Sequence, residues 1–203
     1  MKRQPRPLPR EFYDRHPAGV ARELLGKVLV RKTAADVLRG RILEAEAYLA
    51  ADDPACHASR GRTRKNASMF GPPGHAYVYP IHSRFCFNVV TEPEGVASAV
   101  LIRAVEPLAG LQQMQNRRQR QHVRDLASGP ARLCEAFDID RRLDGWDLTL
   151  GRQLWIVDDG APPPLDESVG RSSRIGVTAA EHLPLRFYIR SHALVSGPRR
   201  LRA

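Results

Sequence analysis

Two acidic side chains and one phenol stand at every second position, separated by alanines, in the segment Arg41-Ile42-Leu43-Glu44-Ala45-Glu46-Ala47-Tyr48. Side chains on a β-strand point alternately to its two faces. One face would carry Leu43, Ala45 and Ala47 toward the core, and the other would carry Ile42, Glu44, Glu46 and Tyr48. A carboxylate beside a phenol could serve as a general base, but glutamates on edge strands are more often only solvated. A catalytic reading therefore requires a pocket, a partner and a substrate.

An arginine inside an apolar segment offers such a partner. Arg103 lies within Ala99–Val105, which reads as a buried strand, and would share a face with Leu101 and Val105. A buried guanidinium needs a counter-charge, so Arg103 would meet Glu46 if the two strands are neighbours. The pair would be either a structural ion pair or a general base kept ionised by arginine, with a water molecule between the two.

The composition indicates a globular protein that meets a polyanion. The chain has 203 residues, 42% of them hydrophobic, and a formal net charge of +10. It contains no apolar run of about 18 residues, and Met1–Arg10 lacks the apolar centre of a secretory signal. Cys56, Cys86 and Cys134 are far apart and odd in number, which disfavours a disulfide framework. We expect a cytoplasmic, nucleoid-associated protein with no membrane contact.

The segments expected to be strands outnumber those expected to be helices. The predicted strands are Lys27–Arg31, Val37–Tyr48, His75–Tyr79, Phe85–Val90, Ala99–Val105 and Leu154–Val157, and the predicted helices are Ala18–Leu25, Pro107–Leu126 and Pro130–Phe137. Residues 162–172 read as a loop. Hairpin-length links predict a single α+β domain with a curved, mostly antiparallel sheet and surrounding helices. The domain would span residues 8–196, between a flexible basic tail at 1–7 and a basic C-terminal tail at 197–203.

Aromatic and histidine side chains gather in the same part of the sequence. Tyr48, Tyr77 and Tyr79 are either ordinary core residues or the walls of a pocket in which a nucleobase stacks. The spacing of the nearby histidines (His57, His75 and His82) matches no zinc motif, so no metal is expected. A basic protein with an aromatic pocket and one activated carboxylate indicates chemistry on a base flipped out of nucleic acid. The carboxylate would stabilise an oxocarbenium-like sugar and deprotonate a water molecule.

Several ordered blocks point to one family. They are Arg39–Tyr48, Cys56–Gly61, Lys65–Phe70, Tyr77–Tyr79, Phe85–Val89, Val100–Leu108, Ser128–Cys134, Arg174–Val177 and Pro184–Tyr188. With these blocks the chain resembles the alkyladenine (3-methyladenine, methylpurine) DNA glycosylase family, as a bacterial member, over roughly residues 8–196. The family resemblance, and not the strand pattern, selects Glu46 over Glu44 as the general base. It also implies that Arg103 and the main-chain carbonyl of Ile175 help to hold the attacking water.

The resemblance further implies how the base and the DNA are held. Tyr48 and Tyr79 would sandwich the flipped base with His57, and Asn88 would disfavour the extra amino group of guanine. DNA contacts would come from Met69 and from the tip of the hairpin after Tyr79. The family places an intercalating tyrosine at that tip, where this chain has His82. A histidine would bury less apolar surface in the vacated stack and hold a flipped nucleotide more weakly.

These expectations form one leading hypothesis and two alternatives. The leading one is a monofunctional DNA glycosylase of base excision repair. It would act as a monomer without cofactor on double-stranded DNA, release 3-methyladenine, 7-methylguanine or hypoxanthine, and leave an abasic site. The first alternative is a non-catalytic protein that binds damaged bases, against which the presence of Glu46 and Arg103 argues. The second is a hydrolase directed at RNA or nucleotides.

Overall fold

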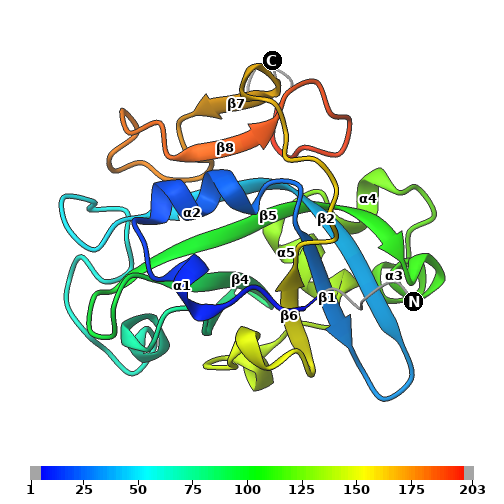
Figure 1. Ribbon diagram of the computed structural model, residues 1–203, viewed down its shortest axis with the longest axis horizontal. Helices are drawn as coiled ribbons and strands as arrows, with labels where there is room; N and C mark the ends of the chain where they lie inside the picture. Colours follow the sequence, from blue (N-terminus) through cyan, green and yellow to red (C-terminus); the bar gives the residue numbers. More distant parts are fainter. Residues whose placement is uncertain (1–5, 199–203) are drawn as a thin grey trace.

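The protein is organised around one antiparallel sheet, seen in a computed structural model that describes residues 6–198 (Figure 1). Within these residues the strands follow the order β3-β4-β5-β2-β1-β6, and β8 pairs with both β2 and β7. The strands are β1 (Val28–Lys32), β2 (Val37–Tyr48), β3 (Ala76–Ile81), β4 (Arg84–Thr91), β5 (Ser98–Ala109), β6 (Leu154–Val157), β7 (Val169–Ser172) and β8 (Arg186–Ile189). The predicted α+β class is confirmed.

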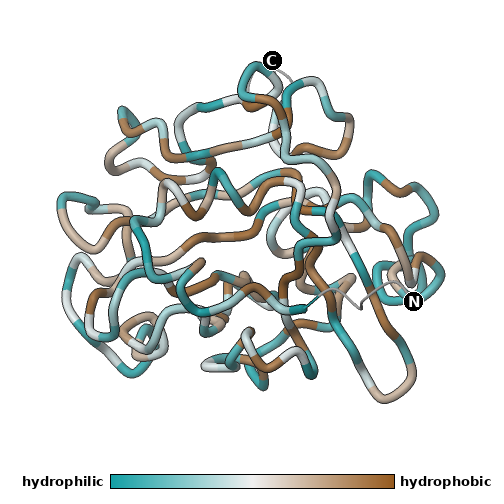
Figure 2. Tube along the Cα trace, in the orientation of Figure 1, coloured by the Kyte–Doolittle hydropathy of each residue, from teal (hydrophilic) through white to brown (hydrophobic). Residues whose placement is uncertain are grey.

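Short helices cover this sheet. They are α1 (Arg10–Tyr13), α2 (Pro17–Leu24), α3 (Leu111–Arg118), α4 (Arg124–Ala127) and α5 (Pro130–Ala136). Helix α2 begins with proline at its first position, where a missing N–H costs nothing, and buries Val20, Ala21 and Leu24. Gly26 follows in the left-handed region, with φ of 84°, so the predicted end of this helix is confirmed. Apolar segments run along the central strands in Figure 2, where the main core lies.

The predicted alternation of β2 is wrong at Ile42 and Leu43. The pairing of β2 with β5 is irregular between Ile42 and Ala45. The alternation of side chains between the two faces of the sheet is therefore interrupted there. Ile42 joins the main core with Ala45 and Ala47, whereas Leu43 packs against Tyr188 of β8. The two glutamates of the strand nevertheless both reach the same arginine of β5.

The same irregularity changes which side chains of β5 share a face of the sheet. Val105 pairs with Ile42 and lies in the main core, so it does not share the face of Arg103 as predicted. Leu101, in contrast, lines the same cavity as Arg103. The β2 strand is also not an edge strand, because β1, β5 and β8 all pair with it. Its carboxylates are therefore buried between neighbours rather than solvated.

The predicted helix Pro107–Leu126 is wrong in its boundaries. Strand β5 continues to Ala109, because residues 106–109 pair with residues 39–41 of β2. Gly110, with φ of 79°, then turns the chain into α3, and Gln119, with φ of 51°, ends that helix before α4. The predicted loop 162–172 likewise contains strand β7, which pairs with β8.

Most of the two predicted tails lies outside the described residues. At the N-terminal side, Pro7 forms an isolated bridge with Val157, and the Leu8 N–H donates to the Ile156 carbonyl at 2.8 Å. The segment from residue 7 onward is thus attached to β6. Between residues 6 and 198, no helix has both the length and the apolar character needed to cross a membrane.

Candidate active site

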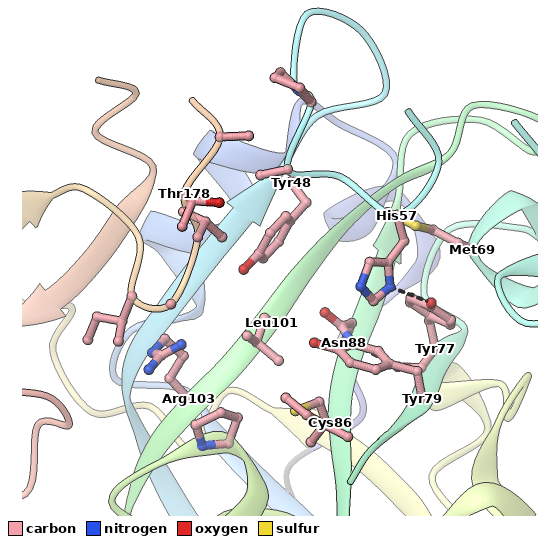
Figure 3. A pocket seen from close by; sticks show the side chains of 18 of the residues that line it. Tyr48, His57, Met69, Tyr77, Tyr79, Cys86, Asn88, Leu101, Arg103 and Thr178 are labelled. Carbon is pink, nitrogen blue, oxygen red and sulfur yellow. Dashed lines mark hydrogen bonds between the residues drawn. The ribbon is translucent and has the colours of Figure 1, made fainter. Parts of the chain in front are cut away.

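A cavity of about 680 Å³ opens where the ends of β2 and β5 meet the β3–β4 hairpin and two loops (Figure 3). The loops are residues 54–60, which follow β2, and residues 175–179, which follow β7. The predicted site residues that line this cavity are Tyr48, His57, Met69, Tyr79, Asn88, Arg103 and Ile175. The fold therefore brings together residues that are up to 127 positions apart along the chain, as Tyr48 and Ile175 are.

Glu46 is fully buried and contacts three of the residues that line this cavity. Its Oε2 accepts hydrogen bonds from Arg103 Nη1 at 3.1 Å and from the Tyr48 hydroxyl at 3.0 Å. Its Oε1 accepts one from the Ile175 backbone N–H at 2.7 Å. The predicted pairing of Arg103 with Glu46 is confirmed, and the two side chains contact each other directly. Ile175 meets Glu46 through its N–H, and the role expected for its carbonyl stays a prediction.

A second buried carboxylate shares the same arginine. Glu44 Oε1 accepts from Arg103 Nε at 3.0 Å and from Arg186 Nε at 2.6 Å, while Oε2 accepts from the Ser196 N–H at 2.7 Å. Burial alone would raise the pKa of Glu44, but the two guanidinium groups outweigh it and lower that pKa. Burial would likewise lower the pKa of Arg103, and the charges of Glu46 and Glu44 raise it. Glu44 and Arg103 are thus held in their charged forms.

Tyr48 forms one wall of the cavity. Its burial, and next the charge of Glu46, raise the pKa of the phenol well above the ordinary value, so the hydroxyl stays protonated and donates to Glu46. The Arg174 guanidinium carbon lies 4.6 Å from the centre of the Tyr48 ring. Arg174 in turn forms a doubly hydrogen-bonded ion pair with Asp53, at 2.6 and 2.7 Å, and both side chains are fully buried.

The other wall is built from β3, β4 and the loop that carries His57. The His57 and Tyr79 rings meet edge to face, with centroids 4.5 Å apart, and His57 Nδ1 lies 2.8 Å from the Tyr77 hydroxyl. Burial lowers the pKa of His57, which favours the neutral imidazole. Asn88 donates to the Tyr77 carbonyl at 3.0 Å. Tyr48 stands across the cavity from this group in Figure 3. The space between the two walls suits a flat aromatic ring.

Of the remaining predicted residues, Met69 lines the cavity, whereas His75 and His82 lie apart from it. His82 is exposed at the tip of the β3–β4 hairpin, with φ of 53°, and is not among the cavity residues. Met69 is buried and lines the cavity. His75 contacts Arg10 instead, so the three histidines do not converge. Among residues 6–198, no three His, Cys, Asp or Glu side chains are placed to hold a metal ion.

Sequence reasoning missed four of the polar residues that surround the site. The missed residues are Asp53, Arg174, Arg186 and Ser196. One of them carried a usable signal: Arg186 stands between Leu185 and Phe187 in an apolar segment, as Arg103 does in its own strand. A guanidinium in such a segment is expected to be buried, so Arg186 also requires a buried residue of opposite charge. Asp53 and Arg174 lie in irregular segments 121 residues apart and gave no comparable signal.

Comparison with known proteins identifies the family of this chain. The sequence profile of the methylpurine-DNA glycosylase (MPG) family matches residues 11–193. A relative from Koribacter versatilis (strain Ellin345) is 48% identical over 200 residues, which cover 96% of this chain and 95% of the relative. One from Carboxydothermus hydrogenoformans is 47% identical and covers 93% of this chain and 98% of the relative. Both are provisionally named 3-methyladenine DNA glycosylases. The chain belongs to the methylpurine-DNA glycosylase family.

Proposed function

We propose that this chain, a 3-methyladenine DNA glycosylase by its family, hydrolyses the N-glycosidic bond of a damaged purine flipped out of duplex DNA. The observation that carries the proposal is a fully buried carboxylate, Glu46, that is hydrogen-bonded to three residues lining a cavity with aromatic walls. The product is free base and an abasic site. The net charge of +10 suits a polyanionic partner such as DNA. We propose in addition that the protein acts as a monomer on one lesion at a time.

The hydrogen bonds of Glu46 suit the role of a general base. An ionised carboxylate offers about four acceptor positions. Arg103, Tyr48 and the Ile175 N–H occupy three of them, which leaves one for a water molecule on the cavity side. In the reaction this water gives a proton to Glu46 and forms the new bond to the sugar C1′, while the electrons of the broken C–N bond leave with the base. The negative charge of Glu46 also stabilises the cationic sugar.

The cavity favours purines that leave without being protonated by the protein. A purine alkylated at N3 or N7 carries a positive charge, stacks well on aromatic rings and departs as a neutral base. Hypoxanthine is neutral and needs a proton as it leaves. Because the pKa of His57 is lowered, the ring is mostly neutral near pH 7 and rarely carries a proton to donate, so we expect slower release of neutral bases. Asn88 lines the same cavity and would disfavour the amino group of guanine.

The β3–β4 hairpin is proposed to enter the DNA. It carries Tyr79 in the cavity and His82 at its exposed tip, so one element would contact both the flipped base and the gap that the base leaves. Met69 lies at the cavity wall and would contact the flipped nucleotide. Side chains that fill the vacated stack stabilise the flipped state by the apolar surface that they bury.

The deciding experiment is single-turnover release of 7-methylguanine from a duplex with one lesion. Glu46→Gln should slow release by about 10²–10⁴-fold, the usual contribution of a general base. Glu23→Gln is the matched control, because Glu23 forms an exposed ion pair with Arg15. Equal rates for wild type and Glu46→Gln would refute the assignment of the base. A wild type that binds the lesion but releases nothing would favour the damage-binding alternative, and stronger competition by RNA or nucleotides would favour the other hydrolase.

A further inference from the structure

A buried ion pair that the proposed reaction does not use lies directly behind Tyr48. Arg174 donates to both carboxylate oxygens of Asp53 and also to the Ala47 carbonyl at 3.0 Å. Asp53 accepts two further bonds, from the Leu49 N–H at 3.0 Å and the Ala55 N–H at 3.1 Å. These four bonds fill the acceptor positions of Asp53. Its role is thus to hold Arg174, not to bind a ligand.

The Tyr48 ring separates this ion pair from the cavity. Tyr48 lines the cavity and Arg174 does not, although its guanidinium carbon is only 4.6 Å from the ring centre. The face that remains for a base is therefore the one opposite Arg174. A base stacked on that face would lie roughly 8 Å from the guanidinium, given the usual stacking distance. Two positive charges at this separation in a protein interior repel by an amount equivalent to about a thirtyfold change in affinity.

We propose that Asp53 sets the preference of this site for cationic over neutral purines, by cancelling the charge of Arg174 behind the stacking ring. The inference rests on the proposed function of the site and adds a determinant of its substrate class. A guanidinium without its counter-charge would repel an N-alkylated, positively charged purine and would leave a neutral purine nearly unaffected. With Asp53 paired, the same guanidinium supports Tyr48 while adding little net charge.

The state of Asp53 agrees with this role. Burial alone would raise the pKa of Asp53, but the hydrogen bonds from Arg174 and from the backbone outweigh it and lower that pKa. The carboxylate therefore stays ionised at neutral pH. The Asp53–Arg174 pair also affects the position of Ile175, because Arg174 immediately precedes it in the chain and the Ile175 N–H donates to Glu46. A useful test must separate the effect of charge from this effect on position.

The test measures the affinity of Glu46→Gln protein for duplexes that contain either 7-methylguanine or hypoxanthine, so that binding is read without chemistry. The measured quantity is the ratio of the two dissociation constants. Asp53→Asn should shift this ratio against the cationic base by up to about thirtyfold, the repulsion of an uncompensated Arg174. Arg174→Gln leaves Asp53 uncompensated and should shift it in the opposite direction. Arg41→Gln is the control, since Arg41 forms an ion pair with Asp159 that has no contact with the cavity.

Shifts of opposite sign support the proposal, because a purely positional role would impair both lesions alike in both variants. Shifts of the same sign, or unchanged ratios in folded variants, would overturn it. If one single variant does not fold, the sign of the shift in the other single variant decides, and an unchanged ratio there overturns the proposal. The double variant Asp53→Asn, Arg174→Gln buries no charge and serves as the control that should return the ratio close to that of the parent protein. Failure of the proposed function appears separately, as a wild type that releases no base.

Discussion

Replacement of Glu44 by glutamine should be among the most destabilising single changes near the site. The side chain is fully buried and accepts hydrogen bonds from Arg103, Arg186 and Ser196. Glutamine keeps the shape but removes the charge, so two buried guanidinium groups lose a counter-charge. Breaking a buried ion pair in this way costs about 3–5 kcal/mol. That cost is a large part of the roughly 5–15 kcal/mol that stabilises a typical domain.

Urea unfolding followed by tryptophan fluorescence measures this cost. The midpoint should fall while the slope m stays unchanged, because the variant exposes the same surface on unfolding. Glu23→Gln is again the matched control, since the Glu23–Arg15 pair is exposed and should contribute at most about 1 kcal/mol. If Glu44→Gln costs no more than Glu23→Gln at neutral pH, the buried network does not stabilise the fold as argued.

The pH dependence of the same difference gives a second check. The pKa of Glu44 is lowered in the folded protein, so its contribution is fully present above the unfolded value of about 4.3 and is lost as pH falls through the folded pKa. The gap in unfolding free energy between wild type and Glu44→Gln should therefore be constant near neutral pH and narrow in acid. A gap that widens on acidification would contradict the assigned direction.

Three further changes test separate parts of the structure. Tyr48→Phe removes the 3.0 Å hydrogen bond to Glu46 but keeps the stacking ring, so single-turnover base release should slow about tenfold to a hundredfold with little change in lesion affinity. His82→Tyr adds apolar surface at the hairpin tip and should tighten binding to a duplex with an abasic-site analogue by about fivefold, measured by fluorescence anisotropy. Gly40→Ala places a methyl group 2.7 Å from Val105 Cγ2 and should lower the unfolding free energy by about 1–3 kcal/mol, measured in urea.

Local pattern predicted much of the framework. The β1–β2 and β3–β4 hairpins were predictable because apolar runs are separated there by short polar turns. The meeting of Arg103 with Glu46 was predictable from the cost of burying an unpaired charge. The choice of Glu46 over Glu44 came from family resemblance, since strand alternation places both on one face. In the structure Glu46 contacts Tyr48 and Ile175, which line the cavity. Glu44 is instead enclosed by Arg103, Arg186 and Ser196.

Features that depend on long-range contacts were not predictable. The change of phase at Leu43 requires both β2 and β5 to be irregular at the same place, and a single-strand pattern cannot reveal it. The continuation of β5 through Pro107 could not be predicted from the sequence, because a proline followed by apolar residues at helical spacing also fits the start of a helix. Strand β4 pairs only with residues 98–101 of β5, so in the described part of the chain Pro107 has a strand partner on one side only, where proline is tolerated.

The buried charges around the site balance one another although the whole chain is strongly basic. Three carboxylates and three guanidinium groups meet there, from Glu44, Glu46, Asp53, Arg103, Arg174 and Arg186. Dissolved ions screen exposed charges over about 8 Å at physiological ionic strength but hardly enter such an interior. Added salt should therefore weaken the capture of DNA by surface arginines steeply while leaving the rate of bond cleavage on already bound DNA nearly constant. Ionic strength would thus control how long the protein stays on DNA, and the enclosed ion pairs would set how fast a trapped lesion is removed.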